Sequence, residues 1–127
     1  MISDSDPSQR AMSDKATTVA ELKQVMQRFV EEREWQRFHN PKSLSMSLAI
    51  EVGELMEHFQ WITNDESVAV RDDRDRVTEI AHEVADCLSY LLSIANALEI
   101  DLADAMRRKM VLNRKKYPVG KPFDPTV

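Results

Sequence analysis

A chain of 127 residues is long enough for one ordinary globular domain and too short for two. Its 43% hydrophobic and 31% charged residues are typical of a globular protein, and its formal net charge of −5 argues against a nucleic-acid polymer as partner. The single cysteine, Cys87, excludes an internal disulfide, and no apolar run is long enough for a membrane span. We therefore expect a cytoplasmic protein that has no membrane partner.

The N-terminal part divides into a polar arm and a first helix. Residues 1–17 are rich in Ser, Asp and Pro without periodicity, which predicts a flexible arm. The helix is expected to begin after Thr18, where Glu21 completes a capping box, and to fade around residues 37–40. Apolar residues three or four positions apart predict one buried face on this helix. They are Leu22, Val25, Met26, Phe29 and Val30.

Asn40 and Pro41 predict the start of a second helix, with Asn40 as its cap, that reaches about residue 62. Residues 63–72 are polar and are expected to form a connecting loop. A long third helix follows over about residues 73–98, and a break at residues 99–101 separates it from a fourth over about residues 102–116. The predicted fold is all-α, a bundle of four to five helices over residues 18–118, with a C-terminal tail at residues 119–127.

A carboxylate interrupts the apolar stripe of the second helix. Glu51 falls between Leu48 and Leu55, inside the stripe, and Glu54 lies one turn further on at its edge. A carboxylate in the stripe must lose water, which costs several kcal/mol unless the charge is paired. Both acids can therefore address one point inside the bundle.

The third helix repeats this arrangement, with Glu83 at the border of its buried arc and Asp86 one turn later. That arc is predicted to contain Ile80, Cys87, Leu91 and Leu98. If the two helices pack antiparallel, the acids converge, and like charges at one place require a cation. Oxygen ligands favour a hard ion, so we predict a Mg²⁺ site that is also the catalytic site. Its four residues are Glu51, Glu54, Glu83 and Asp86.

Other interpretations of these acids stay open. Glu57 and Glu79 lie nearby and can replace or supplement the four ligands. Glu79 and His82 match the Glu-x-x-His pattern of di-iron bundles once, but no second copy occurs and His82 points away from the Glu83 side. The acids can also be solvated surface in a helical interaction module that is not an enzyme.

Aromatic residues gather near two helix ends. Trp35 and His39 lie at the end of the first helix, and Trp61 lies at the end of the second. Two tryptophans can form walls around a planar base, or they can close the end of the bundle. His39 fits a capping or surface histidine equally well, and we include it among the candidates for substrate binding.

Basic residues gather on the fourth helix. Lys109, Asn113 and Lys116 share one face and can hold phosphate oxygens that a metal leaves free. Cations at a helix C-terminus also interact favourably with the helix dipole, which explains the position of Lys116 without any ligand.

Four short motifs occur in this order: Glu51-Val-Gly-Glu-Leu, Glu83-Val-Ala-Asp, Lys109-Met, and Asn113-Arg-Lys-Lys-Tyr-Pro. Together they resemble the MazG-like branch of the all-α NTP pyrophosphohydrolases. The segments Glu34-Trp-Gln-Arg-Phe-His-Asn-Pro and Phe59-Gln-Trp are similar to the dCTP pyrophosphatase subgroup. The likeness covers roughly residues 19–118.

The resemblance implies Mg²⁺-dependent hydrolysis of a nucleoside triphosphate, dCTP or a related pyrimidine deoxynucleotide, to the monophosphate and pyrophosphate, and a role in cleaning the nucleotide pool. It implies that the four acids bind the metal, that Trp35 and Trp61 lie beside the base, and that Lys109, Asn113 and Tyr117 lie near the phosphates. It also implies a homodimer or homotetramer with pockets completed across subunits.

One departure widens the choice of substrate. Met26 aligns with a histidine that some members of the subgroup place at the base pocket, so dUTP, dTTP and modified bases stay open. In the expected mechanism water attacks the α-phosphorus, and Glu51 is the first candidate for the base because burial raises its proton affinity. Two rivals remain, a phosphoribosyl-ATP pyrophosphohydrolase with the same acids and the interaction module without a metal.

Overall fold

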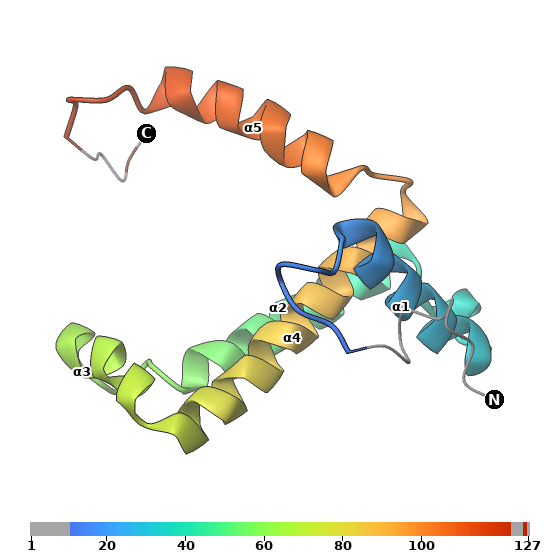
Figure 1. The fold of residues 1–127 in the computed structure, drawn as a ribbon, viewed down its shortest axis with the longest axis horizontal. Coiled ribbons are helices and arrows are strands. Elements are labelled where there is room, and N and C mark those ends of the chain that lie inside the picture. The colour runs from blue at the N-terminus through green and yellow to red at the C-terminus, as the bar shows by residue number, and fades with distance from the viewer. Residues whose placement is uncertain (1–10, 123–125, 127) are drawn as a thin grey trace.

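The computed structural model describes residues 11–122 and 126, and this part of the chain is helical without any strand (Figure 1). Its helices are α1 (Val19–Glu32), α2 (Pro41–Glu57), α3 (Asn64–Ala69), α4 (Arg74–Ala97) and α5 (Leu102–Lys116), with 3-10 turns η2 (Gln36–Phe38) and η3 (Val70–Asp72). The predicted all-α class is confirmed. Most of the predicted arm lies outside the described residues, and the division into arm, domain and tail stays a prediction. In the described part, no helix has the length and apolar character needed to cross a bilayer.

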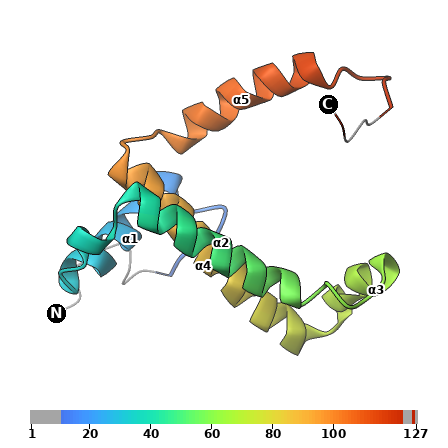
Figure 2. The ribbon, with the colours of Figure 1, turned by 180° about the vertical axis from the view of Figure 1, so that it is seen from behind.

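The centre of the fold is an antiparallel pair of long helices, α2 and α4, and α1 packs across the C-terminal half of α4 (Figures 1 and 2). The buried apolar side chains come from these helices and from η3. They are Val30, Leu44, Val70, Leu92 and Ala95. This core is small for a chain of this length, and many large apolar side chains of the described part remain exposed.

Helix α1 begins as predicted and ends earlier than predicted. The Glu21 backbone N–H donates to Thr18 Oγ1 over 3.1 Å, and the Thr18 N–H donates to Glu21 Oε1 over 3.2 Å, which makes a complete capping box. At the other end Glu34 adopts a φ of 53° and the Trp35 N–H donates to the Val30 carbonyl. This is a Schellman motif, in which the residue with positive φ is usually glycine. Because glutamate stands there in this chain, the sequence did not indicate where the helix ends.

Helix α2 also begins as predicted and stops early. Asn40 Oδ1 accepts the Ser43 N–H over 2.9 Å, and Pro41 is the first helical residue. The expected continuation to residue 62 is wrong, because α2 ends at Glu57 and turns follow over residues 58–62. The expected loop at residues 63–72 is also wrong, because α3 and η3 occupy that segment. Thr63 caps α3, and its hydroxyl pairs with Glu66 over 3.0 Å. This T-x-x-E signal was present in the sequence but was not recognised.

The predicted break between α4 and α5 is confirmed, and it has the same form as the end of α1. Glu99 has a φ of 53°, and the Ile100 N–H donates to the Ala95 carbonyl over 2.9 Å. Lys23 of α1 holds this turn, since its Nζ donates to the Ile100 carbonyl over 2.7 Å. After the turn α5 diverges from the α2–α4 pair (Figures 1 and 2).

The predicted buried arc of α4 needs correction. Leu91 is 46% exposed and Leu98 is 53% exposed, whereas α4 buries Leu92, Ser93 and Ala95. The reason is that α1 and α2 cover only part of the circumference of α4, so in the described part of the chain Leu91 and Leu98 remain about half exposed.

Replacing Leu44 by alanine should destabilise the fold by about 2–5 kcal/mol, because the side chain is 2% exposed and its loss leaves a cavity. The matched control, Lys42→Ala, changes an exposed residue of the same helix and should change stability by less than about 0.5 kcal/mol. Urea denaturation at one protein concentration measures both effects. Equal stability of the two variants would contradict the placement of Leu44 in the core.

Candidate functional site

The acids of the two long helices meet between them. One carboxylate oxygen from each of Glu51, Glu83 and Asp86 lies within 4.8 Å of those of the other two. Glu51 comes from the middle of α2, and Glu83 and Asp86 lie one turn apart on α4. The antiparallel packing of α2 and α4 therefore produces the convergence that the sequence predicted.

Glu54 belongs to the same cluster by its contacts. Its carboxylate is close enough to raise the pKa of both Glu51 and Glu83, and it lies one turn after Glu51 on α2. Glu57 and Glu79, which the sequence left open as alternative ligands, are exposed and are not members of the metal-binding group found among the described residues.

Two oxygens of this cluster are buried without a partner. Glu51 Oε2 and Glu83 Oε2 have no hydrogen bond although solvent does not reach them. Loss of hydration raises the pKa of Glu51, and the nearby Glu54 carboxylate raises it further. Loss of hydration raises the pKa of Glu83 in the same way, again with help from Glu54. Glu51 and Glu83 therefore keep their protons to a higher pH than exposed glutamates do, and a cation would compete with those protons.

The donor set fits a hard divalent cation. All four groups offer carboxylate oxygens, which Mg²⁺ prefers, and the two orphaned oxygens are satisfied only by a donor or a cation inside the cluster. Glu51, Glu54, Glu83 and Asp86 are the residues that would hold such an ion.

A cavity of about 420 Å³ opens beside the acids and contains an aromatic wall. Trp35, Phe29 and Tyr90 line it together with Glu51 and Asp86. The Phe29 and Trp35 rings meet edge to face, with centroids 5.7 Å apart. A planar ring in this cavity would lie between aromatic side chains and within reach of the acids.

Sequence reasoning missed Ser89, Tyr90 and Ser93, which also line this cavity. Tyr90 lies four positions after Asp86, and Ser89 lies three positions after it, so both follow the acid by one helical turn. That spacing was visible in the sequence, but the sequence did not show that this face of the helix borders the cavity.

The two tryptophans occupy different places. Trp35 lies in the cavity at the end of α1, whereas Trp61 follows the far end of α2 and is 86% exposed. Trp61 is not among the residues that line the cavity of Trp35. One chain therefore does not bring Trp61 to the base that Trp35 would contact.

The basic face of α5 also lies apart from the acids. Lys109, Lys116 and Tyr117 are exposed and Asn113 is half-buried, but the residues lining the cavity beside the acids come from α1, α2, α4 and the α1–α2 connection. Arg107 and Arg108, also on α5, both pair with Asp104 of the same helix, each at 2.7 Å.

The chain is similar to several known proteins. The family model of the MazG-like family matches residues 46–124. The dCTP pyrophosphatase 1 of Bos taurus is 37% identical over 103 residues, which are 80% of this chain and 60% of the relative. The Homo sapiens protein of that name is 36% identical over 101 residues, 80% of this chain and 59% of its own. The chain thus spans about 60% of the length of these curated relatives.

A solved structure gives wider coverage. The crystal structure of a pyrophosphatase from Archaeoglobus fulgidus aligns with a TM-score of 0.73 and 38% identity, over 85% of this chain and 99% of that chain.

The raised pKa values of Glu51 and Glu83 predict how Mg²⁺ should act on stability. Between the usual value of 4.5 and the raised value, the folded protein binds more protons than the unfolded chain. The stability of the metal-free protein is therefore greatest below pH 4.5 as far as these groups contribute, and falls as the pH rises through the folded-state pKa. Saturating Mg²⁺ should raise the melting temperature by about 5 °C at pH 8 and by much less at about pH 5, where protons compete.

Differential scanning fluorimetry measures this difference. Glu51→Gln should remove most of the Mg²⁺ effect, and the control Glu57→Gln should keep it. An equal Mg²⁺ effect at both pH values in the wild-type protein would contradict the site.

Proposed function

This chain belongs to the MazG-like family, and from that premise we propose that it hydrolyses a nucleoside triphosphate to the monophosphate and pyrophosphate. The observation that carries the proposal is the convergence of Glu51, Glu83 and Asp86, with the Glu54 carboxylate near them, beside an aromatic-lined cavity. The relatives named dCTP pyrophosphatase 1 support a pyrimidine deoxynucleotide, dCTP or a close analogue, as substrate. Removal of unwanted nucleotides from the pool is the role that this activity would serve.

The acids are proposed to hold Mg²⁺ at the triphosphate. When bound, the metal would bridge phosphate oxygens and neutralise the charge that grows on them during phosphoryl transfer. Glu51, Glu54, Glu83 and Asp86 would bind it, because they are the four carboxylates that meet between α2 and α4.

The side chains of the cavity would orient the reaction. The ring of Trp35 and its neighbours would hold the base, so that the triphosphate extends toward Glu51 and Asp86. The oxygen of water forms a bond to the α-phosphorus while the bond from that phosphorus to the bridging oxygen breaks. Pyrophosphate leaves, and the proton of the water passes to a carboxylate, for which Glu51 is the first candidate.

The decisive test is an incubation of the protein with Mg²⁺ and a panel of ribo- and deoxynucleoside triphosphates in ¹⁸O-labelled water. We expect monophosphate and pyrophosphate, with the label in the monophosphate, and the fastest turnover with a pyrimidine deoxynucleotide. Label in pyrophosphate would overturn attack at the α-phosphorus. Absence of turnover with every triphosphate, together with turnover of phosphoribosyl-ATP, would assign the chain to that other reaction.

Replacement of Glu51 by glutamine or of Asp86 by asparagine should lower kcat by about 10³-fold or more, because each change removes a charged ligand without changing side-chain size. Glu57→Gln on the same helix is the matched control and should retain activity. Circular dichroism would show that the helical fold persists in all three variants. Full activity in both ligand variants would refute the assignment of the site.

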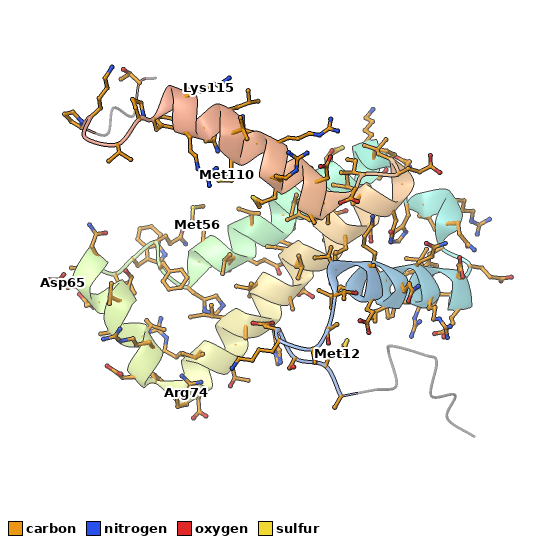
Figure 3. The ribbon with its side chains drawn as sticks, turned by 45° about the horizontal axis from the view of Figure 1, so that its top comes forward. Met12, Met56, Asp65, Arg74, Met110 and Lys115 are labelled. Carbon is orange, nitrogen blue, oxygen red and sulfur yellow. The ribbon has the colours of Figure 1, made fainter. Side chains whose placement is uncertain are left out.

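A second copy of the chain is proposed to complete the site. Exposed apolar side chains follow the outer faces of α2, α4 and α5, among them Met56 and Met110, which stand out from their helices (Figure 3). Ile50 is 65% exposed, one turn before Gly53, where an added Cβ would meet no atom within 4 Å. Such a face is unusual for a monomer and suits close packing of another helix.

The same partner would supply the basic residues of its α5 and its Trp61 to the site of the first chain. Within one chain α5 diverges from the α2–α4 pair and Trp61 does not line the cavity of Trp35, yet a phosphorylated ligand needs positive groups around it. A homodimer or homotetramer in which α5 of one subunit reaches the acids of another would satisfy this requirement.

Mixing two inactive variants tests this arrangement. One subunit carries Glu51→Gln, and the other carries Lys109→Ala with Asn113→Ala. If sites are shared, refolding them together should restore about a quarter of wild-type activity, because half of the dimers are mixed and each has one intact site. No restoration, with mixed oligomers confirmed by mass, would place both residue groups in the same chain.

A further inference from the structure

We propose that Lys23, a residue of α1, is a positioning residue for the site of a partner subunit, because it holds the turn from which α5 starts. This inference deepens the proposed function and rests on its shared site, in which α5 of one chain reaches the acids of another. It is carried by two hydrogen bonds between α1 and the C-terminal end of α4, and by the sparse packing of α5 against the other described helices.

The direction of α5 depends on its starting point. No residue of this helix is buried, and only Leu102, Asp104 and Asn113 are half-buried. Figures 1 and 2 show it as a separate arm that leaves α4 and runs away from the α2–α4 pair. Contacts along its length therefore do not orient α5 within one chain, and the turn at residues 98–101 does.

Local bonds give that turn its shape. Glu99 adopts a φ of 53°, which residues other than glycine rarely adopt, and the Ile100 N–H donates to the Ala95 carbonyl over 2.9 Å. The Asp101 carboxylate then accepts the Asp104 N–H over 2.9 Å and caps α5. All of these partners belong to α4, the turn or α5, so these bonds do not connect the turn to α1.

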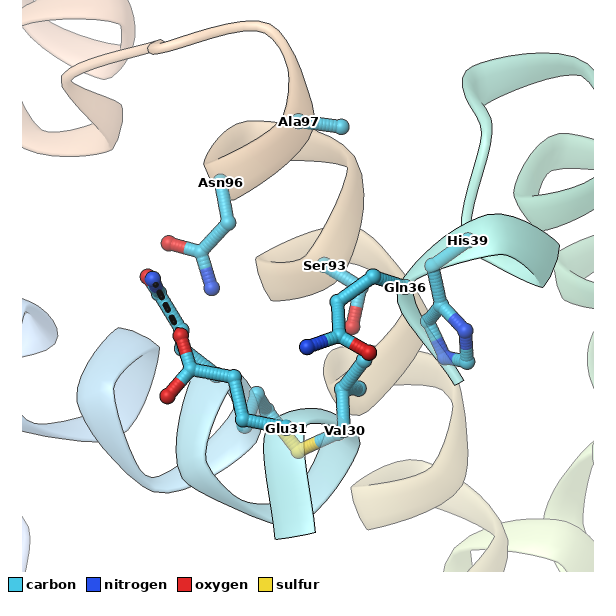
Figure 4. Close-up of a pocket in the computed structure, with 9 residues that line it drawn as sticks. Val30, Glu31, Gln36, His39, Ser93, Asn96 and Ala97 are labelled. Atoms are coloured by element: carbon cyan, nitrogen blue, oxygen red, sulfur yellow. Dashed lines mark hydrogen bonds between the residues drawn. The ribbon is translucent and has the colours of Figure 1, made fainter. Parts of the chain in front are cut away.

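Lys23 makes that connection. Its Nζ donates to the Ile100 carbonyl over 2.7 Å, and Asn96 Nδ2 donates to the Lys23 carbonyl over 3.0 Å. Both bonds are partly buried, and the first has a charged donor, which makes it stronger than a bond between neutral groups. Figure 4 shows the Asn96 side chain at a cavity of about 180 Å³ between α1 and α4, which His39 also lines. His39 lines the cavity beside the acids as well.

Packing does not replace the Lys23 bond. A cavity of about 550 Å³ lies beside it, between the first turn of α1 and the first turn of α5, and Thr18, Lys23, Ile100 and Leu102 are among its lining residues. Because side chains do not fill this space, the start of α5 has room to shift when the bond from the ammonium is lost.

A small shift at the turn would have a large effect at the other end of α5. Asn113 lies about 16 Å from Leu102 along the helix at 1.5 Å per residue, so a change of about 10° in direction moves it by about 3 Å. Such a displacement exceeds what a binding group at a reacting phosphate tolerates. The site that loses Lys109 and Asn113 in this way would be the partner's, while the acids of the altered chain stay intact.

The first test measures turnover of Lys23→Met, which removes the ammonium and keeps the length of the side chain. kcat/KM for the preferred triphosphate should fall about 10-fold or more, and Lys23→Arg, which keeps a charged donor, should retain most of it. Stabilisation by Mg²⁺ should persist in Lys23→Met, because its own acids are unchanged. Lys42→Met, at an exposed lysine of α2, is the control and should change neither quantity. Loss of the Mg²⁺ effect in Lys23→Met would overturn the proposal.

Mixed oligomers show where Lys23 acts. Refolding Lys23→Met with Glu51→Gln should restore about a quarter of wild-type activity, because each mixed dimer has one site with intact acids and a correctly placed α5. Refolding it with the chain that carries Lys109→Ala and Asn113→Ala should restore nothing, because every α5 is then impaired.

The opposite pattern would mean that Lys23 acts on the acids or the aromatic wall of its own chain. An ammonium near the C-terminus of α4 also interacts favourably with the dipole of that helix, and a loss of stability alone would give the same result with both partner chains. Either outcome would overturn the proposal.

A second measurement needs no turnover. In Lys23→Met the Ile100 amide, which closes the turn, should exchange its hydrogen about 10-fold faster, whereas the Trp35 amide, in the same motif at the end of α1, should not change. Asn96→Leu removes the reverse bond and should give the same pattern if Lys23→Met does not fold. Unchanged exchange at Ile100 would overturn the proposal.

Failure of the proposed function would look different. Absence of turnover with every triphosphate would refute hydrolysis, and the exchange of the Ile100 amide would still report whether Lys23 holds the turn. Turnover without restoration between Glu51→Gln and the chain with Lys109→Ala and Asn113→Ala would leave hydrolysis standing, and would refute the shared site and this proposal with it.

Discussion

The fold is organised around a conflict of like charges. Glu51 and Glu83 bring buried, unpartnered oxygens into the contact between α2 and α4, which is also the main packing interface of the chain. Hydrophobic contact draws the two helices together, and their carboxylates oppose that approach unless protons or a cation neutralise them. The raised pKa values of both residues are the signature of this conflict. A divalent ion bound by this cluster, as proposed, would neutralise these charges and so strengthen the same interface.

Two Schellman endings determine what surrounds that cluster. Glu34 and Glu99 both have φ values of 53°, a conformation that costs a non-glycine residue about 1 kcal/mol or more. At Glu34 the turn brings Trp35 back onto Phe29 and forms the aromatic wall, so the local cost is offset by ring contact. At Glu99 the turn sends α5 away from the acids, and the bond from Lys23 to Ile100 fixes its starting point. The positions of the aromatic wall and of α5 thus depend on two turns in which glutamate, not glycine, has the positive φ.

The sequence revealed the acids because they break a strong pattern. Glu51 stands among Leu48 and Leu55, and such an interruption has few physical explanations, so convergence with Glu83 was predictable. The helix caps at Thr18 and Asn40 were equally visible, since their donors and acceptors are local. The sequence could not show which partner covers an apolar face. Leu91 and Leu98 have the periodicity of buried residues and are exposed in the single chain, because periodicity identifies a face to be covered without identifying what covers it.

This last distinction bears on the proposed oligomer. Phosphates require positive groups, the basic residues that the sequence assigns to phosphate lie on α5, and α5 diverges from the acids. The apolar faces that remain open on α2, α4 and α5 are the surfaces on which another copy would pack. If one association event both covers these faces and brings α5 to a neighbouring cluster, then hydrophobic burial supplies the free energy that holds like-charged acids, metal and triphosphate together. Assembly and the formation of a complete site would then be one process, and the isolated chain would contain only the metal-binding half of it.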